Sequence, residues 1–296
     1  MKKVSKILAI ALVILTMAGL AVFTTACGGG GGAEDGGSET ANAKVRVIDI
    51  DLTQEDYAFG VDKDQEDLLK KANEIIADLK ESGEFDEICN HYFGDGEPVA
   101  VTSGTLDTSK DQLVVATNAA FEPFEFMKGD KYYGIDMEIA QIIADKMGKE
   151  LVINNMDFDA VCLSVGQHKC DIAMAGLTVN KERTKYVTFS TPYYEASQRL
   201  IVAADDTTFD ECKTAEDVNK ILSGFDKSTK MGYQNGTTGQ FYVQGNKDWD
   251  FPGLKVDGKG YKNGSLAVQD LVNGNIKYVI IDKAPADAIT AKINAQ

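Results

Sequence analysis

The chain lacks most of the motifs that mark an enzyme. It contains only two histidines, and its five cysteines follow no C-x-x-C spacing. No nucleophile motif G-x-S-x-G, P-loop or dinucleotide fingerprint occurs, since CLSVG at 162–166 lacks the first glycine. No lysine or arginine run occurs, and the net charge is −16, which argues against a nucleic-acid partner. We therefore expect no catalytic residue and no cofactor.

The cysteines are better explained by packing than by metal or disulfide chemistry. Cys89 and Cys162 fall in apolar periodic segments, where a free thiol behaves as a small hydrophobe. Cys162, His168 and Cys170 are close in sequence, but no fourth ligand is nearby, so we predict no metal site. Buried thiols are favoured over disulfides for these residues and for Cys212.

The N-terminal segment has the pattern of an export signal. Three lysines precede an apolar run at 7–23, and small residues then lead to Cys27. We interpret 1–26 as a signal peptide and 27–44 as a flexible Gly-rich tether. The cysteine directly after the cleavage site resembles the bacterial lipoprotein signal, which implies a lipid anchor at Cys27 on the outer face of the cell membrane. The alternatives are a plain secretory signal or a membrane-spanning anchor.

From residue 45 onward, the hydrophobic spacing predicts alternating strands and helices. Strands are expected at 45–50, 57–61, 113–117, 151–153, 172–174, 186–189, 198–203, 229–233, 254–257 and 277–281. Helices are expected at 68–79, 85–93, 134–147, 159–168, 214–222, 237–244, 264–273 and 284–293. This alternation is typical of parallel sheets covered by helices, and two runs of it indicate two α/β lobes.

The order of the segments suggests a circular permutation. Lobe 1 is expected at 112–201 and lobe 2 at 202–296, where the pattern ends on a helix. If the front of the chain followed Gln296, residues 45–54 would supply a return strand to lobe 2. Residues 55–93 would supply two helices to lobe 1, and 94–111 would be the linker that joins the ancestral termini.

Five sequence blocks resemble one protein family. They are ATNAAFEPFEF (116–126), GIDMEIAQIIADKM (134–147), AGLTVNKER (175–183), NGTTG (235–239) and IIDKAPA (280–286). In the permuted order, they resemble the amino-acid-binding solute-binding proteins of ABC transporters, family 3. The resemblance implies a type II periplasmic-binding-protein fold and a monomer that presents a polar amino acid to an ABC permease in the membrane.

Arg183 is the residue expected to hold the carboxylate of such a ligand. Arginine is planar and bidentate, which suits a carboxylate held away from water. Thr178 lies five residues earlier and can add a hydroxyl donor, and the resemblance adds Thr238 from the NGTTG loop. The alternatives are a surface ion pair of Arg183 with Glu182 and an ordinary turn at NGTTG.

Asp282 is the residue expected to hold the α-ammonium group. It follows an apolar strand, and open α/β sheets place ligand groups at such strand ends. The resemblance supports this role and adds Gly176. The alternative is that Asp282 serves only as the N-cap of the following helix.

The resemblance also implies which residues contact the ligand's side chain. Phe121 and Phe158 match stacking positions, although aromatic residues are more often part of a core. Ala175, Gln234 and Asn118 complete the set. Family members that bind cationic side chains often carry aspartate at the position of Asn118, so a neutral polar ligand such as glutamine or cystine is slightly favoured over arginine or lysine. A ligand-sensing module and a dehydratase-like enzyme on the same fold are the alternative functions.

Overall fold

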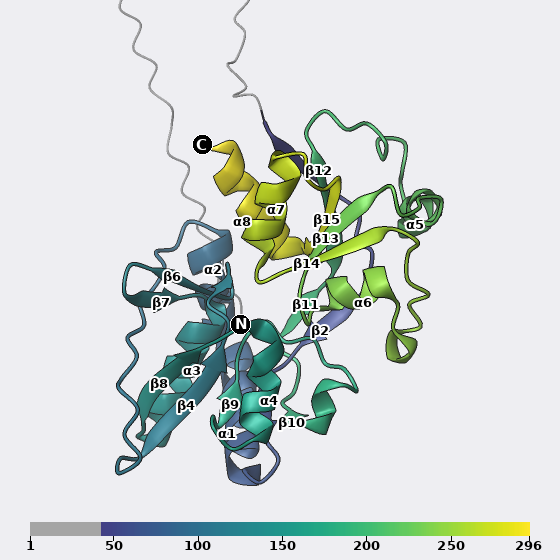
Figure 1. Cartoon of the computed structure of the whole chain (residues 1–296). Helices are drawn as coiled ribbons and strands as arrows, with labels where there is room; N and C mark the ends of the chain where they lie inside the picture. The colour runs from purple at the N-terminus through teal and green to yellow at the C-terminus, as the bar shows by residue number, and fades with distance from the viewer. Residues whose placement is uncertain (1–42) are drawn as a thin grey trace, which may run out of the picture. The chain divides into compact units, whose positions relative to one another are not determined.

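The computed structural model describes residues 43–296. The predicted signal peptide 1–26, the lipidation site Cys27 and nearly all of the tether 27–44 lie outside the described residues. The described chain contains two five-stranded sheets with helices packed against them, and two smaller sheets (Figure 1).

The first large sheet and its helices form what we call lobe 1. Its strand order is β10-β3-β9-β4-β8, with β4 parallel to both β8 and β9. The strands are β3 (Gly60–Asp62), β4 (Gln112–Thr117), β8 (Glu150–Asn155), β9 (Ile172–Ala173) and β10 (Val187–Phe189). The helices are α1 (Glu66–Ser82), α2 (Glu84–Phe93), α3 (Ile135–Met147) and α4 (Val161–Gly166), with short 3-10 turns η1 (Phe158–Ala160) and η2 (Arg183–Lys185).

The second large sheet and its helices form lobe 2. Its strand order is β1-β12-β15-β13-β14, and β13 runs parallel to β14 and β15. The strands are β1 (Val45–Ile48), β12 (Gln198–Ala203), β13 (Lys230–Gln234), β14 (Asp257–Tyr261) and β15 (Tyr278–Asp282). The helices are α5 (Ala215–Ser223), α6 (Thr238–Gln244), α7 (Gly264–Val272) and α8 (Lys283–Asn294), with a 3-10 turn η3 (Lys247–Trp249).

Two short strands carry the chain between the lobes. After β1 in lobe 2, the chain runs through β2 (Glu55–Tyr57) to β3 in lobe 1. It returns from β10 through β11 (Tyr194–Ala196) to β12 in lobe 2. The strands β2 and β11 pair antiparallel and lie side by side in Figure 1. We call this pair the hinge strands.

The front of the chain contributes to both lobes. Strand β1 pairs antiparallel with β12, from Val45 opposite Ala203 to Ile48 opposite Leu200. Helix α1 packs on α2, α3 and β3. Its buried face repeats at helical spacing and comprises Leu68, Ala72, Ile75, Ile76 and Leu79. In α2, the imidazole of His91 lies 3.0 Å from Glu138 of α3, so this helix is bound to lobe 1 by polar contacts as well.

The structure differs from the sequence-based expectation in its shortest elements. The strand expected at 254–257 lies at 257–261, where the sequence DGKGY has no apolar alternation to reveal it. The helix expected at 159–168 is divided into η1 and α4. A small three-stranded sheet was not expected. It comprises β5 (Ala120–Phe121), β6 (Glu125–Lys128) and β7 (Lys131–Tyr133), with Gly129 at φ +67° in the tight turn between β6 and β7.

Candidate ligand-binding site

The residues predicted to bind a ligand lie where strands of the two lobes end. Asn118 follows β4, Ala175 lies just beyond β9, and Gln234 and Asp282 are the last residues of β13 and β15. This is the edge at which open α/β sheets place ligand groups. A hydrogen bond joins the two edges directly, since the Gln234 side-chain amide donates to the side-chain oxygen of Asn118 at 3.1 Å.

Arg183 is buried between the lobes. Its Nη1 donates to the carbonyl of Thr178 at 2.7 Å, and its Nη2 donates to the carbonyl of Gly236 in lobe 2 at 3.1 Å. The guanidinium lies 5.1 Å from the centre of the Phe158 ring. Glu182 pairs with Lys185 instead, so the surface pair between Arg183 and Glu182 does not form.

The guanidinium lacks a charged partner of its own. None of the ion pairs among residues 43–296 includes Arg183, and the side chain is 8% exposed. Burial lowers the pKa of Arg183, because the charged form loses hydration. A buried cation held only by carbonyl oxygens has the chemistry to bind a ligand carboxylate.

Thr178 lies beside Arg183, and its hydroxyl is already engaged as a donor. It lies 2.7 Å from Oε2 of Glu55, a buried carboxylate on β2. The hydroxyl of Thr178 is the donor of this bond, and it has no second proton to give. The Thr238 hydroxyl of lobe 2 lies 3.4 Å away and donates to Thr178 Oγ1. In this arrangement the rest of the Thr178 oxygen can only accept a hydrogen bond. A role for Thr178 at a ligand carboxylate stays a prediction.

Asp282 is buried at the end of β15, and its carboxylate faces the hinge. It accepts a 2.6 Å hydrogen bond from the Tyr57 hydroxyl of β2. The side chain makes no capping bond to helix α8, although the residue holds the N-cap position. Burial, followed by the nearby charge of Glu55, raises the pKa of Asp282 to about 7. The carboxylate is thus available to a cationic group, and capping does not use it.

Gly176 is held in place by a buried carboxylate of α3. Its N–H donates to Asp136 at 3.0 Å, and the other oxygen of Asp136 accepts from the Tyr193 hydroxyl at 2.6 Å. Burial raises the pKa of Asp136 to about 7. Gly176 has φ +52°, and an added Cβ would lie 2.9 Å from the ring of Phe121, so glycine is required for both reasons.

The residues expected at the ligand's side chain surround the same place. Phe121 and Ala175 are buried and Phe158 is half-buried. The Asn118 side-chain amide donates to the carbonyl of Met156 at 2.6 Å. The side-chain oxygen of Gln234 is buried and has no hydrogen-bond partner among the described residues, so this end of the site offers an unused acceptor.

The sequence did not reveal three buried acids near this site. Glu55, Asp136 and Glu125 lie on short or amphipathic elements where a charge usually faces solvent. Within the described residues, neither oxygen of Glu125 has a partner, and burial raises its pKa well above the usual range, with further contributions from Asp136 and Asp282. The signal for Glu55 is long-range: its partners Thr178 and Gln198 are 123 and 143 residues away.

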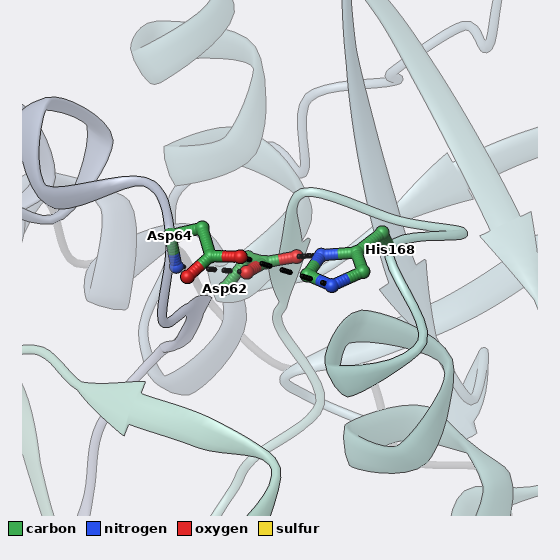
Figure 2. Close-up of side chains that lie close together, drawn as sticks. All are labelled: Asp62, Asp64 and His168. Carbon is green, nitrogen blue, oxygen red and sulfur yellow. Dashed lines mark hydrogen bonds and ion pairs between the residues drawn. The ribbon is translucent and has the colours of Figure 1, made fainter.

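A second polar cluster was also not expected from the sequence. Asp62, Asp64 and His168 bring three possible metal-ligand atoms within 4.8 Å of one another (Figure 2). Nδ1 of His168 lies 2.6 Å from Asp62, while Nε2 lies 3.8 Å from Asp64. The imidazole thus lies between two carboxylates and is hydrogen-bonded to that of Asp62. The four cysteines of the described chain are free thiols, two of them buried.

Comparisons with known proteins agree with this architecture. The model of the bacterial extracellular solute-binding proteins, family 3, matches residues 113–283. The chain belongs to this family. Its two-lobed α/β architecture is the type II periplasmic-binding-protein fold, and holo ArgBP from T. maritima superposes with a TM-score of 0.52 at 33% identity, covering 62% of this chain and 75% of that chain.

Curated relatives match over part of their length. The arginine-binding extracellular protein ArtP of Bacillus subtilis is 33% identical over 33% of this chain and 39% of its own length. The ABC transporter arginine-binding protein 1 of Escherichia coli is 31% identical over 60% of this chain and 65% of its own. The chain thus spans less than two thirds of these two relatives. No helix between residues 43 and 296 has the length and apolar character needed to span a bilayer.

Proposed function

We propose that the protein captures a polar L-amino acid between its two lobes and presents it to an ABC permease. The observation that carries this proposal is Arg183, a buried guanidinium between the lobes that is held by carbonyl oxygens alone. A ligand carboxylate would supply the missing negative charge. Asp282 would hold the α-ammonium, with Gly176, while Thr178 and Thr238 would assist at the carboxylate through their backbone N–H groups.

The ligand's side chain would be directed toward Asn118, Phe121, Phe158, Ala175 and Gln234. Amide groups of Asn118 and Gln234 offer both donors and acceptors, which suits glutamine or cystine. Several relatives are named as arginine-binding proteins, which favours arginine instead. Both kinds of ligand carry the same α-carboxylate and α-ammonium. Measured affinities are therefore needed to choose between them.

A ligand screen tests this function. We expect one class of polar amino acid to raise the melting temperature of the purified protein, because a ligand that binds only the folded state stabilises it. The measurement is thermal unfolding with each of the twenty amino acids and cystine, followed by calorimetry. No shift with any of them would contradict the proposal. Consumption of a ligand by the protein would instead favour the dehydratase-like alternative.

The predicted lipid anchor at Cys27 would hold the receptor at the outer face of the membrane. Residues 27–44 would then act as a flexible tether of the kind that Gly-rich segments form. A flexible tether leaves the lobes free to dock on the permease, whichever lobe the anchor joins. We propose that the receptor acts as a monomer.

We further propose that the chain is a circular permutation of the family's order. The first support is that the family match begins at residue 113, behind the segment that supplies β1, α1 and α2. The second is the proximity of α8 to β1. The side chain of Asn294, at the end of α8, accepts from the backbone N–H groups of Lys44 at 2.9 Å and Val45 at 3.2 Å. A connection of a few residues would therefore join α8 to β1 without moving either.

Restoring the ancestral order tests the permutation. A chain in which residues 112–296 are followed, through a short Gly-Ser linker, by 45–93 should fold and bind the same ligand. We expect a melting temperature within a few degrees and an affinity within about threefold of the original, because all strand pairings remain. A matched control that opens the chain inside β12 should not fold. Failure of the restored chain to fold would refute the permutation.

A further inference from the structure

We infer that Glu55 is a positioning residue of the ligand site: it fixes the Thr178 hydroxyl as an acceptor, so that the site selects ligands that carry an α-ammonium group. This inference rests on the proposed function. It concerns a residue on the hinge strands rather than one of the groups predicted to contact the ligand.

The contacts of Glu55 determine which way its neighbours' protons point. The carboxylate is 2% exposed. One oxygen accepts from the hydroxyl of Thr53 at 2.6 Å and from the side-chain amide of Gln198 at 3.1 Å. The other oxygen accepts from Thr178 at 2.7 Å. A hydroxyl has a single proton, so the bond to Glu55 leaves only lone pairs on the rest of Thr178 Oγ1.

One of those lone pairs accepts from the Thr238 hydroxyl of lobe 2 at 3.4 Å, so Thr178 Oγ1 lies where the two lobes meet. The other lone pair can accept a further hydrogen bond. A ligand that enters between the lobes meets an acceptor at this point. An ammonium N–H satisfies this acceptor, whereas a carboxylate oxygen brought by the ligand leaves lone pairs facing one another.

The charge of Glu55 acts in the same direction. Glu55 and Asp282 are both buried, and they lie close enough for the charge of Glu55 to raise the pKa of Asp282. An α-ammonium beside these two carboxylates would bring a compensating positive charge. Glu55 therefore favours binding of the ammonium in two ways, through the orientation of Thr178 and through the electrostatic attraction of its own carboxylate.

The position of Glu55 links this preference to the hinge. Glu55 lies on β2 and is paired with Ala196 of β11 in the hinge strands. Its hydrogen bonds reach Thr178 of lobe 1 and Gln198, the first residue of β12 in lobe 2. The orientation of Thr178 thus depends on the same strand through which the chain crosses between the lobes.

Glu55→Gln provides a test that keeps the shape of the side chain. An amide can donate to Thr178, which then turns its own proton toward the ligand. The matched control is Asp56→Asn, which removes the same charge from the next, exposed residue of β2. The probes are L-arginine with 5-guanidinopentanoate, which lacks the α-amine, and L-glutamine with glutaramate. Calorimetry of the full chain gives the four affinities, and thermal unfolding checks that each variant folds.

We expect Glu55→Gln to weaken binding of the amino acid by about tenfold to a hundredfold. Binding of its amine-free analogue should weaken by less than about threefold. Asp56→Asn should change neither. Glu55→Asp, which retains an acceptor, should recover part of the preference. Equal losses for the amino acid and its analogue would overturn the inference, because a merely structural role weakens both. If neither amino acid binds the unaltered protein, the proposed function fails for these ligands and the role of Glu55 fails with it.

Discussion

Arg183→Ala is expected to weaken ligand binding by roughly 30-fold to several-thousand-fold, which corresponds to about 2–5 kcal/mol. The reason is that the variant leaves the ligand's carboxylate buried without its cationic partner. The guanidinium also joins the lobes through Thr178 and Gly236, so its removal takes away a contact between them. Isothermal titration calorimetry with the ligand identified in the screen measures the loss.

Two further variants make the result specific. Lys185→Ala removes a positive charge from the same 3-10 turn. Because Lys185 is exposed and pairs with Glu182, this variant should bind the ligand with unchanged affinity. Arg183→Lys keeps the charge and loses the bidentate geometry, so its ligand affinity should lie between those of Arg183→Ala and Lys185→Ala. An unchanged affinity in Arg183→Ala, with the fold intact, would contradict the assignment.

The elements that sequence reasoning located well are those with a long periodic pattern. Helix α1 buries one face at helical spacing and ends at Gly83, which adopts φ +83°. Strand β12 was expected at the residues where it is found. Strand β14 was displaced because its glycines and charges carry no alternation, and the sheet of β5, β6 and β7 was missed because two to four residues cannot show a period.

The candidate site also contains residues that a local sequence pattern reveals and residues that it does not. Arg183 and Asp282 could be singled out as candidates, because each lies in a sequence block that resembles the family and follows a strand or turn. Their surroundings could not be derived in this way. Tyr57 meets Asp282 across 225 residues of chain, and Asp136 meets Gly176 across 40. Only the fold brings these groups together, and they determine which atoms remain free for a ligand.

Binding is also expected to strengthen as the pH rises from about 5 to 7, because Asp282 must be ionised to hold an α-ammonium. Burial, then the charge of Glu55, raises the pKa of Asp282 to about 7, so the carboxyl is largely protonated at pH 5. The ammonium stabilises the carboxylate and lowers its pKa, and binding therefore releases a proton. Affinity should fall by up to about tenfold for each pH unit below 7. Titrations in buffers of different ionisation enthalpy measure the proton release directly.

The stability of the unliganded protein should change with pH in the opposite direction and fall as the pH rises. A carboxyl whose folded-state pKa is raised stabilises the fold at acidic pH and loses that contribution as the pH rises through 7. Asp136, also raised to about 7, adds to this trend. Asp282→Asn should flatten the pH dependence of binding and weaken the slope of stability, whereas Asp287→Asn, at an exposed position on α8, should leave the binding slope unchanged. A pH-dependent affinity that persists in Asp282→Asn would assign the proton to another group and remove Asp282 from the ammonium site.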